Sequence, residues 1–240
     1  MPPSRLQLAK RTITTFFDGA EQRIFSRKDF SAILSQHRAD WRLAYSTTVN
    51  EFIDFLLQNA KLKEAKLQSK TYSLPARYSW GDASPYSLAL SLRRAGYLSH
   101  ATAMFVHALT EQIPKTIYVN FEQSPKPRPS GLSQESLDRA FANRQRHTNY
   151  IFRYGDQQIA ILSGKQTGRL GAVNARGPAG ENVDVTNLER TLIDIVVRPD
   201  YAAGVFQVLQ SVSFQGSWLP HFLLLDRGRS RRPGVLFAYR

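Results

Sequence analysis

In the first 74 residues, stretches with apolar residues at helical spacing are separated by short polar connections. The spacing predicts helices over Leu6–Phe17 and after each of two capping-box patterns, Ser26–Asp29 and Thr48–Glu51. Residues 23–25 are expected to be a short extended piece, and residues 62–74 alternate polar and apolar side chains like a small hairpin. The order helix, strand, helix, helix, hairpin predicts a winged helix-turn-helix.

A second helical region follows and leads into a strand. Ser84 is a good N-cap, and Pro85 occupies the first helical position, where its missing N–H does no harm. This helix is expected to stop at Gly96 and the next to begin at Ser99, and residues 117–119 are typical of a buried strand. The apolar stripe of the second helix is expected to contain Ala101, Met104, Phe105, Ala108 and Leu109.

The remaining sequence predicts further helices and a β-hairpin. Residues 133–146 are expected to form a polar helix, and residues 149–162 a hairpin. Thr186 opens another helix with a capping-box pattern, in which Arg190 and Asp194 are i, i+4 partners. The buried face of this helix is predicted to consist of Leu188, Leu192, Ile195 and Val196.

The composition fits a folded and strongly basic protein. The chain has 240 residues, of which 42% are hydrophobic, and this is enough for one large domain or two small ones. From the predicted elements we expect an α+β protein, with a winged helix-turn-helix over residues 1–74 and a mixed α+β domain over residues 75–240. The formal net charge of +13 favours a nucleic-acid partner over an anionic membrane surface or an acidic protein. Cysteine is absent, and no apolar run is long enough to span a membrane, so we expect a cytoplasmic protein without a membrane partner.

Basic and polar side chains concentrate at the start of the third helix and in the alternating stretch after it. Recognition helices read base edges with residues near their N-terminus, and wings contact phosphate. The alternative is a small helical domain that packs on the rest of the chain and has an ordinary solvated face. With two cations at the start of the second helix included, the predicted DNA-binding residues are Arg27, Lys28, Arg42, Tyr45, Ser46, Thr47, Thr48, Asn50, Lys61, Lys63, Lys66 and Lys70.

The sequence offers no catalytic motif. Residues 163–168 look like a phosphate-binding loop, but the first glycine is missing and no Ser or Thr directly follows Lys165, so we interpret them as an ordinary loop. His100 and His107 lie roughly 10 Å apart along a helix, too far to share a metal ion, and are expected to be packing histidines. We therefore expect no metal, no cofactor and no enzymatic activity, although scattered carboxylates can always meet as an acid–base pair in the fold.

Two segments of the second domain resemble the AbiEi antitoxins of type IV toxin–antitoxin systems. GYLSHATAMFVHALTEQIPKTIYVN, residues 96–120, is similar to the family's YLSH-x-TA helix and IPK strand entry. TNLERTLIDIVVRPDYAAG, residues 186–204, is similar to its T-x-LERTL-x-D helix. The resemblance spans residues 72–204, the basic N-terminal segment looks like the family's winged-helix domain, and little resemblance remains beyond Gln210.

The resemblance implies a protein with two activities. The N-terminal domain would bind inverted repeats in operator DNA and repress the antitoxin–toxin operon, and the C-terminal domain would counter a nucleotidyltransferase-like toxin, with or without direct contact. The alternatives are a basic module that binds an acidic protein, or an enzyme of unrecognised type. From charge and expected exposure, we predict that the antitoxin surface includes Arg93, Arg94, Arg139, Arg144 and Arg146.

Overall fold

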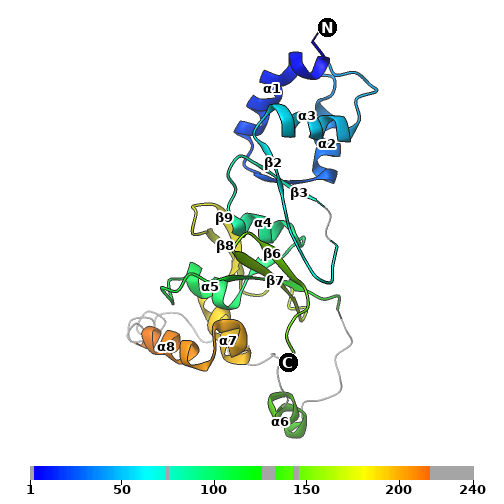
Figure 1. The fold of residues 1–240 in the computed structure, drawn as a ribbon. Helices are drawn as coiled ribbons and strands as arrows, with labels where there is room; N and C mark the ends of the chain where they lie inside the picture. Colours follow the sequence, from blue (N-terminus) through cyan, green and yellow to red (C-terminus); the bar gives the residue numbers. More distant parts are fainter. Residues whose placement is uncertain (1–2, 74–75, 126–132, 143–145, 217–240) are drawn as a thin grey trace, which may run out of the picture.

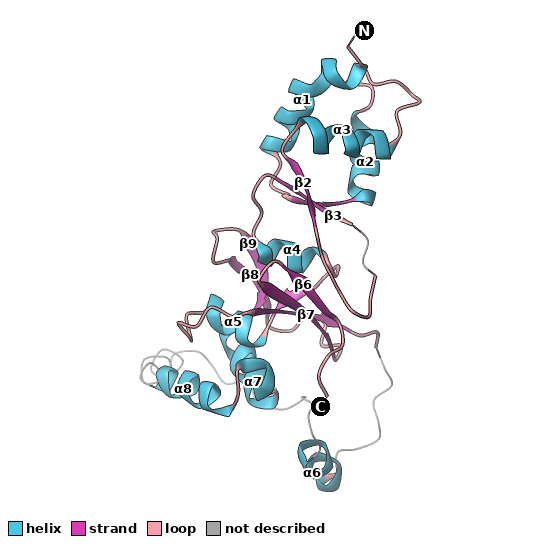
Figure 2. Ribbon diagram, in the orientation of Figure 1, coloured by secondary structure: helices cyan, strands magenta, loops and turns pink. Residues whose placement is uncertain are grey.

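The computed structural model describes residues 3–73, 76–125, 133–142 and 146–216, and the fold is mixed α+β. Over these ranges the chain forms eight α-helices and two β-sheets. Figure 1 shows two units stacked end to end, with the first sheet facing the second unit. In Figure 2 the strands of both sheets lie between helices α1–α3 at one end and α5, α7 and α8 at the other.

The N-terminal unit combines three helices with a three-stranded antiparallel sheet of order β1-β3-β2. Both predicted capping boxes are confirmed. The backbone N–H of Ser26 donates to Asp29 Oδ2 at 2.6 Å, and that of Thr48 donates to Glu51 Oε2 at 2.8 Å. Each box satisfies backbone donors that the first helical turn leaves without partners. The elements are α1 (Arg5–Gly19), β1 (Ile24–Ser26), α2 (Arg27–His37), α3 (Val49–Asn59), β2 (Leu62–Ala65) and β3 (Arg77–Trp80).

Aromatic rings fill the core of this unit. The Phe17 ring stacks on Trp80 with centroids 4.8 Å apart and meets Phe25 edge-on at 5.3 Å. Phe30 and Phe52 complete the cluster, and all five side chains are at most 2% exposed. The indole N–H of Trp80 donates to Asp18 Oδ1 at 2.8 Å, so the one polar atom of the cluster is also satisfied.

The predicted hairpin over residues 62–74 is wrong. Only its first four residues form a strand, and the partner of that strand is β3, with Leu62 opposite Trp80 and Ala65 opposite Arg77. Residues 66–76 connect the two strands, and we call this segment the connecting loop. Alternation alone did not reveal the partner because β3 lies beyond the stretch that alternates. The sheet pairing extends the N-terminal unit to Trp80, past residue 74.

The C-terminal unit contains a six-stranded mixed sheet of order β6-β7-β5-β4-β9-β8. Its longest pairing is the parallel pair β5–β7, and the predicted hairpin over residues 149–162 is confirmed as the antiparallel pair β6–β7. Helix α4 contacts the sheet on the side of the N-terminal unit, whereas α5, α7 and α8 lie at the far side (Figure 1). The strands are β4 (Tyr97–Leu98), β5 (Thr116–Glu122), β6 (Ile151–Tyr154), β7 (Gln157–Gly164), β8 (Ala172–Arg176) and β9 (Asn182–Thr186).

Two helices of this unit are shorter than predicted. Helix α4 ends at Ser91, before the expected stop at Gly96. The second predicted helix ends at Val106, because Ala108 adopts φ 54°, and Ala108 is exposed while Phe105 is only half-buried. Helix α6 matches the predicted polar helix and, in Figure 1, lies apart from the sheet. The helices and the short 3₁₀ turn are α4 (Pro85–Ser91), α5 (His100–Val106), α6 (Gln134–Ala142), α7 (Leu188–Val197), η1 (Pro199–Ala202) and α8 (Val205–Gly216).

Two predictions for helix α7 are wrong in part. The helix is capped by Asn187 and not by Thr186, and its buried face differs from the predicted one. Ile195 is buried, but Val196 is 59% exposed, whereas Arg190 and Thr191 are buried. Helical periodicity counts apolar residues only. Here the Arg190 guanidinium lies inward because it donates to groups of β4 and of the loop after β7, and the Thr191 hydroxyl because it bonds Thr186 and Asn187. Helix α7 therefore contributes a polar group to the interior of the unit.

No helix in the described part of the chain is long and apolar enough to cross a membrane.

Candidate nucleic-acid interface

The loop before helix α3 is held in shape by one arginine. The Arg38 guanidinium donates to the carbonyl oxygens of Ala44 at 2.6 Å, Tyr45 at 3.1 Å and Thr47 at 3.0 Å. Arg38 also lies over the Tyr45 ring, 5.8 Å from its centroid. Arg38 is absent from the predicted binding residues. From its sequence position at the end of an amphipathic helix, an arginine that binds loop carbonyl groups cannot be told apart from one that is solvated.

The predicted residues at the start of α3 lie together at one end of the N-terminal unit. Arg42 adopts φ 51° and is exposed, and the Tyr45 side chain is 95% exposed. Ser46 and Asn50 are exposed as well, whereas Thr47 is half-buried. The Thr48 hydroxyl accepts from the Glu51 backbone N–H, so its role here is to cap the helix. Exposed polar side chains at a helix N-terminus are the arrangement with which recognition helices contact DNA.

Helix α3 extends this cluster as a polar stripe. Asn50, Asp54 and Gln58 are spaced by four residues and are all exposed, while Phe52 and Leu56 face the core. Asn and Gln side chains suit adenine, and Asp accepts from cytosine N4. Asp54 and Gln58 were not predicted, although the i, i+4, i+8 spacing from Asn50 was available in the sequence. We call these three residues the α3 stripe.

Acidic groups lie beside the α3 stripe. Burial and the nearby carboxylates of Glu64 and Asp54 raise the pKa of Tyr78, against the effect of Arg27. The Tyr78 hydroxyl therefore lies in the electrostatic field of charged side chains from the start of α2, the middle of α3 and strand β2. Arg27 and Lys28 are exposed there, at the opposite end of α2 from the loop that precedes α3. The predicted binding residues thus occupy both ends of α2.

The four predicted lysines of the β2 region do not form one row. Lys61 Nζ pairs with Asp18 at 3.0 Å, and Lys63 Nζ pairs with Asp82 at 2.8 Å. Hydrogen bonds from Trp80 and Lys61 lower the pKa of Asp18, and the bond from Lys63 lowers that of Asp82. Lys66 and Lys70 are exposed in the connecting loop.

The connecting loop binds the C-terminal sheet. The Gln68 backbone N–H donates to the Arg153 carbonyl at 3.0 Å, and the Arg153 N–H donates back at 2.7 Å. The Tyr72 ring stacks on Tyr150 with centroids 4.0 Å apart and an interplanar angle of 11°. Leu67 packs against the apolar side chains between the two units. In Figure 1 this loop runs beside β6, away from α1 and from the loop before α3.

The predicted antitoxin arginines lie in different surroundings. Arg93 is half-buried, with its guanidinium 4.8 Å from the centroid of the Phe121 ring and 5.6 Å from that of Tyr150. Arg94 is exposed beside it, Arg139 is exposed on α6, and Arg146 is exposed before β6. Arg144 lies outside the described residues. The arrangement gives Arg93 a packing role next to the connecting loop.

A buried polar network surrounds Arg190 in the C-terminal unit. Its guanidinium donates to the Tyr97 hydroxyl at 2.9 Å, to Thr167 Oγ1 at 3.0 Å and to the Leu170 carbonyl. Asp194 is its i, i+4 partner, with Nε and Oδ2 3.6 Å apart, as predicted. Burial raises the pKa of Asp194 despite this neighbour.

The network fixes the loop over residues 163–168. Burial opposes ionisation of Glu122, but hydrogen bonds from Thr167 and from the Arg169 backbone lower its pKa below the usual value. Gly171 adopts φ 71°, and an added Cβ would lie 3.0 Å from the Arg190 Cβ. Thr167 in this segment bonds Glu122 and Arg190 of the same chain. The geometry therefore agrees with the ordinary loop predicted from the sequence.

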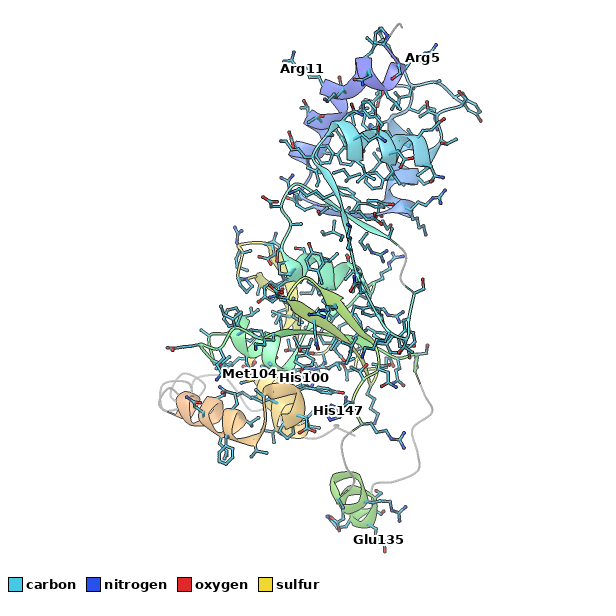
Figure 3. The ribbon with its side chains drawn as sticks, in the orientation of Figure 1. Arg5, Arg11, His100, Met104, Glu135 and His147 are labelled. Carbon is cyan, nitrogen blue, oxygen red and sulfur yellow. The ribbon has the colours of Figure 1, made fainter. Side chains whose placement is uncertain are left out.

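The two motif histidines are internal. His100 is buried at φ 52°, its Nδ1 lies 2.9 Å from Ser99 Oγ, and its ring meets Tyr201 edge-on at 5.4 Å (Figure 3). Burial, with Arg198 and Arg190 nearby, lowers the pKa of His100 to about 3. His107 Nε2 bonds the Thr186 carbonyl at 2.6 Å. Among the described residues, no three His, Cys, Asp or Glu side chains form a cluster that could hold a metal ion.

No protein-family model matches the chain, and no curated protein matches its sequence.

Proposed function

We propose that this protein is a DNA-binding autorepressor and antitoxin of a type IV toxin–antitoxin operon. The N-terminal unit would act as a winged helix-turn-helix, and the chain would act without catalysis and without a cofactor. The observation that carries the DNA-binding half is the α3 stripe, three exposed amide and carboxylate side chains on a capped helix that follows a polar loop. The element order and the β1-β3-β2 sheet support the same interpretation.

The roles in DNA binding follow from side-chain chemistry. Asn50, Asp54 and Gln58 would contact base edges in the major groove, and Arg42 and Ser46 would contact the backbone beside them. Tyr45 exposes its whole ring in a loop that Arg38 holds in place, so it is available for a sugar or phosphate contact. The operator is expected to contain inverted repeats, as the family resemblance implies.

The antitoxin half rests on the resemblance of residues 96–120 and 186–204. The structure supports a common role for these segments, because Tyr97 from the first bonds Arg190 from the second. Tyr97 and Arg190 are both buried in the C-terminal unit. The surface that opposes a nucleotidyltransferase-like toxin must therefore use other residues. Arg94 and Arg146 are the exposed candidates on the body of the unit.

The test compares the full chain with two matched variants on its own promoter. Asn50→Ala should weaken binding to the promoter by about 1–3 kcal/mol and relax the preference at one base pair, because a bidentate contact is lost. Asn182→Ala, an exposed amide in β9, is the control and should bind like the wild type. In cells, Asn50→Ala should deregulate the operon but still protect against the toxin.

Three results would contradict parts of this proposal. If the wild type binds its promoter no better than a random duplex at moderate salt, sequence-specific regulation is wrong. A pulled-down acidic protein without a DNA footprint would favour the protein-interaction module. Turnover of a phosphoryl or nucleotide substrate that one carboxylate substitution abolishes would favour an enzyme.

A further inference from the structure

The outer surface of helix α1 carries positive charge without nearby compensation. Lys10 and Arg11 are exposed, and in the described structure their side chains form no hydrogen bond or ion pair. From Arg5 to Phe17 the helix contains no Asp or Glu, and Asp18, the first acid, is already engaged by Lys61 and Trp80.

A shallow surface, widely open to solvent, runs along this face of α1, and we call it the α1 hollow. Its lining combines two cations with an amide and two hydroxyl groups, which are the side chains that proteins use on DNA phosphates. Figure 3 shows Arg11 on one side of α1 and Arg5 on the other, so Arg5 is not part of the hollow. The lining residues are Gln7, Leu8, Lys10, Arg11, Thr14 and Thr15.

The α1 hollow adjoins the helix to which base contacts are assigned. Gln7 Nε2 donates to Asn59 Oδ1 at 3.4 Å, so the first half of α1 lies beside the C-terminal end of α3. Gln58, the last residue of the α3 stripe, is at that same end. A duplex that follows the stripe therefore reaches α1 next.

In a winged helix-turn-helix the wing usually supplies the flanking phosphate contacts. Here the connecting loop, which is at the position of the wing, is bound to the C-terminal sheet. Gln68 is paired with Arg153, and Tyr72 is stacked on Tyr150 of the C-terminal sheet. Strand β2 beside α3 also carries the exposed Glu64, whose carboxylate repels a phosphate backbone. Lys10 and Arg11 on α1, which form no ion pair in the described structure, can supply these contacts instead.

We propose that the α1 hollow, through Lys10 and Arg11, binds the phosphate backbone of the duplex that α3 reads, in place of the connecting loop. This inference rests on the proposed DNA-binding function. Phosphate contacts position a protein but carry no sequence information, so α1 supplies affinity and the α3 stripe supplies specificity.

The experiment compares two double variants that lose the same charge. Lys10→Gln with Arg11→Gln removes the hollow's cations, and Lys66→Gln with Lys70→Gln removes those of the connecting loop. Glutamine favours helix as lysine and arginine do, so α1 should fold normally, and circular dichroism and the melting temperature check this. Affinity is measured against salt concentration for the promoter duplex and for a random duplex of equal length.

The α1 variant should bind both duplexes on the order of 50-fold more weakly at about 0.1 M salt, and the slope of log K against log salt should fall by roughly 2 units. The loop variant should keep the wild-type slope. A slope that falls only in the loop variant, or equally in both, overturns the inference. Binding of polyglutamate through the hollow with an unchanged DNA slope would assign it to a protein partner and also overturn the inference.

The two proposals fail separately. A wild type that does not prefer its promoter contradicts the proposed regulator, while the comparison of the two variants on random duplex still decides where phosphate is bound.

Discussion

The N-terminal unit is filled by aromatic rings, whereas the C-terminal unit places a guanidinium in its interior. Around Phe17 the contacts are between rings and depend on volume and shape. Around Arg190 they are hydrogen bonds with fixed donors and acceptors, and each lost partner leaves a buried polar group unsatisfied. The comparison teaches that two cores of one chain can differ in how they tolerate a conservative change.

The largest expected effect comes from the conservative change in the polar core. Arg190→Lys keeps the charge but loses the planar fork that reaches Tyr97, Thr167 and Leu170 together, so the unfolding free energy should fall by about 3 kcal/mol. Urea denaturation measures this, with the exposed Arg94→Lys as a control that should change little. A cost below the control's error would mean that the network does not stabilise the unit.

The pH dependence of the same unit provides the second prediction. The pKa of His100 is lowered to about 3 in the folded state, against an unfolded value near 6.5. Between these values the unfolded chain binds a proton that the native state does not, so stability falls as pH falls through this range. At about pH 4.5 the loss should be about 2–3 kcal/mol.

The variant His100→Asn isolates this contribution, because Asn tolerates the positive φ at this position. The fall in unfolding free energy between about pH 7 and about pH 4.5 should be smaller in the variant by the same amount. Identical pH profiles for variant and wild type would show that His100 is protonated equally in both states.

In the aromatic core a conservative change should cost less. Phe52→Leu retains most of the buried volume, and its neighbours Phe30 and Trp41 can shift, so we expect a loss of about 1 kcal/mol. The measurement is again urea denaturation. A loss as large as that of Arg190→Lys would remove the distinction between the two cores.

Effects as small as that of Phe52→Leu should come from the helix caps, which both units share. Ser26 Oγ accepts from the Asp29 N–H at 3.3 Å, and Asn187 Oδ1 accepts from the Arg190 N–H at 3.0 Å. Ser26→Ala and Asn187→Ala should each cost about 1 kcal/mol. A markedly larger cost at Asn187 would mean that the polar network extends to the start of α7.

Local signals predicted the caps of α2, α3 and α4, but Ser99 makes no side-chain cap hydrogen bond and α7 is capped by Asn187 instead of Thr186. Long-range pairing decided much of the rest. The two capping boxes are visible in four consecutive residues, so the sequence was sufficient for them. The partner of β2 is β3, which begins twelve residues after β2 ends. It lies beyond the alternating stretch, and no local pattern marks it. The inward direction of Arg190 depends on Tyr97 and Thr167, which are distant in sequence. Periodicity therefore placed Val196 on the buried face of α7 and left Arg190 off it.

The candidate interface was predictable to a similar extent. The cluster from Arg42 to Asn50 follows from polar residues at a helix start, and Asp54 and Gln58 could have been found by the same helical spacing. The pairing of Lys61 and Lys63 with Asp18 and Asp82 could not, because the acids belong to other elements. Net charge counts cations but does not show which of them are already neutralised.

The pairing of Gln68 with Arg153 has a consequence for aggregation. Strand β6 is the edge of the six-stranded sheet, and exposed sheet edges invite pairing with other chains. The connecting loop covers part of this edge with two backbone hydrogen bonds. A fragment that begins at residue 75 would uncover the edge and would also carry β3 without β1 and β2, two unpaired strands on one molecule. The N-terminal unit and the connecting loop thus cover strand edges through which the C-terminal unit could otherwise self-associate.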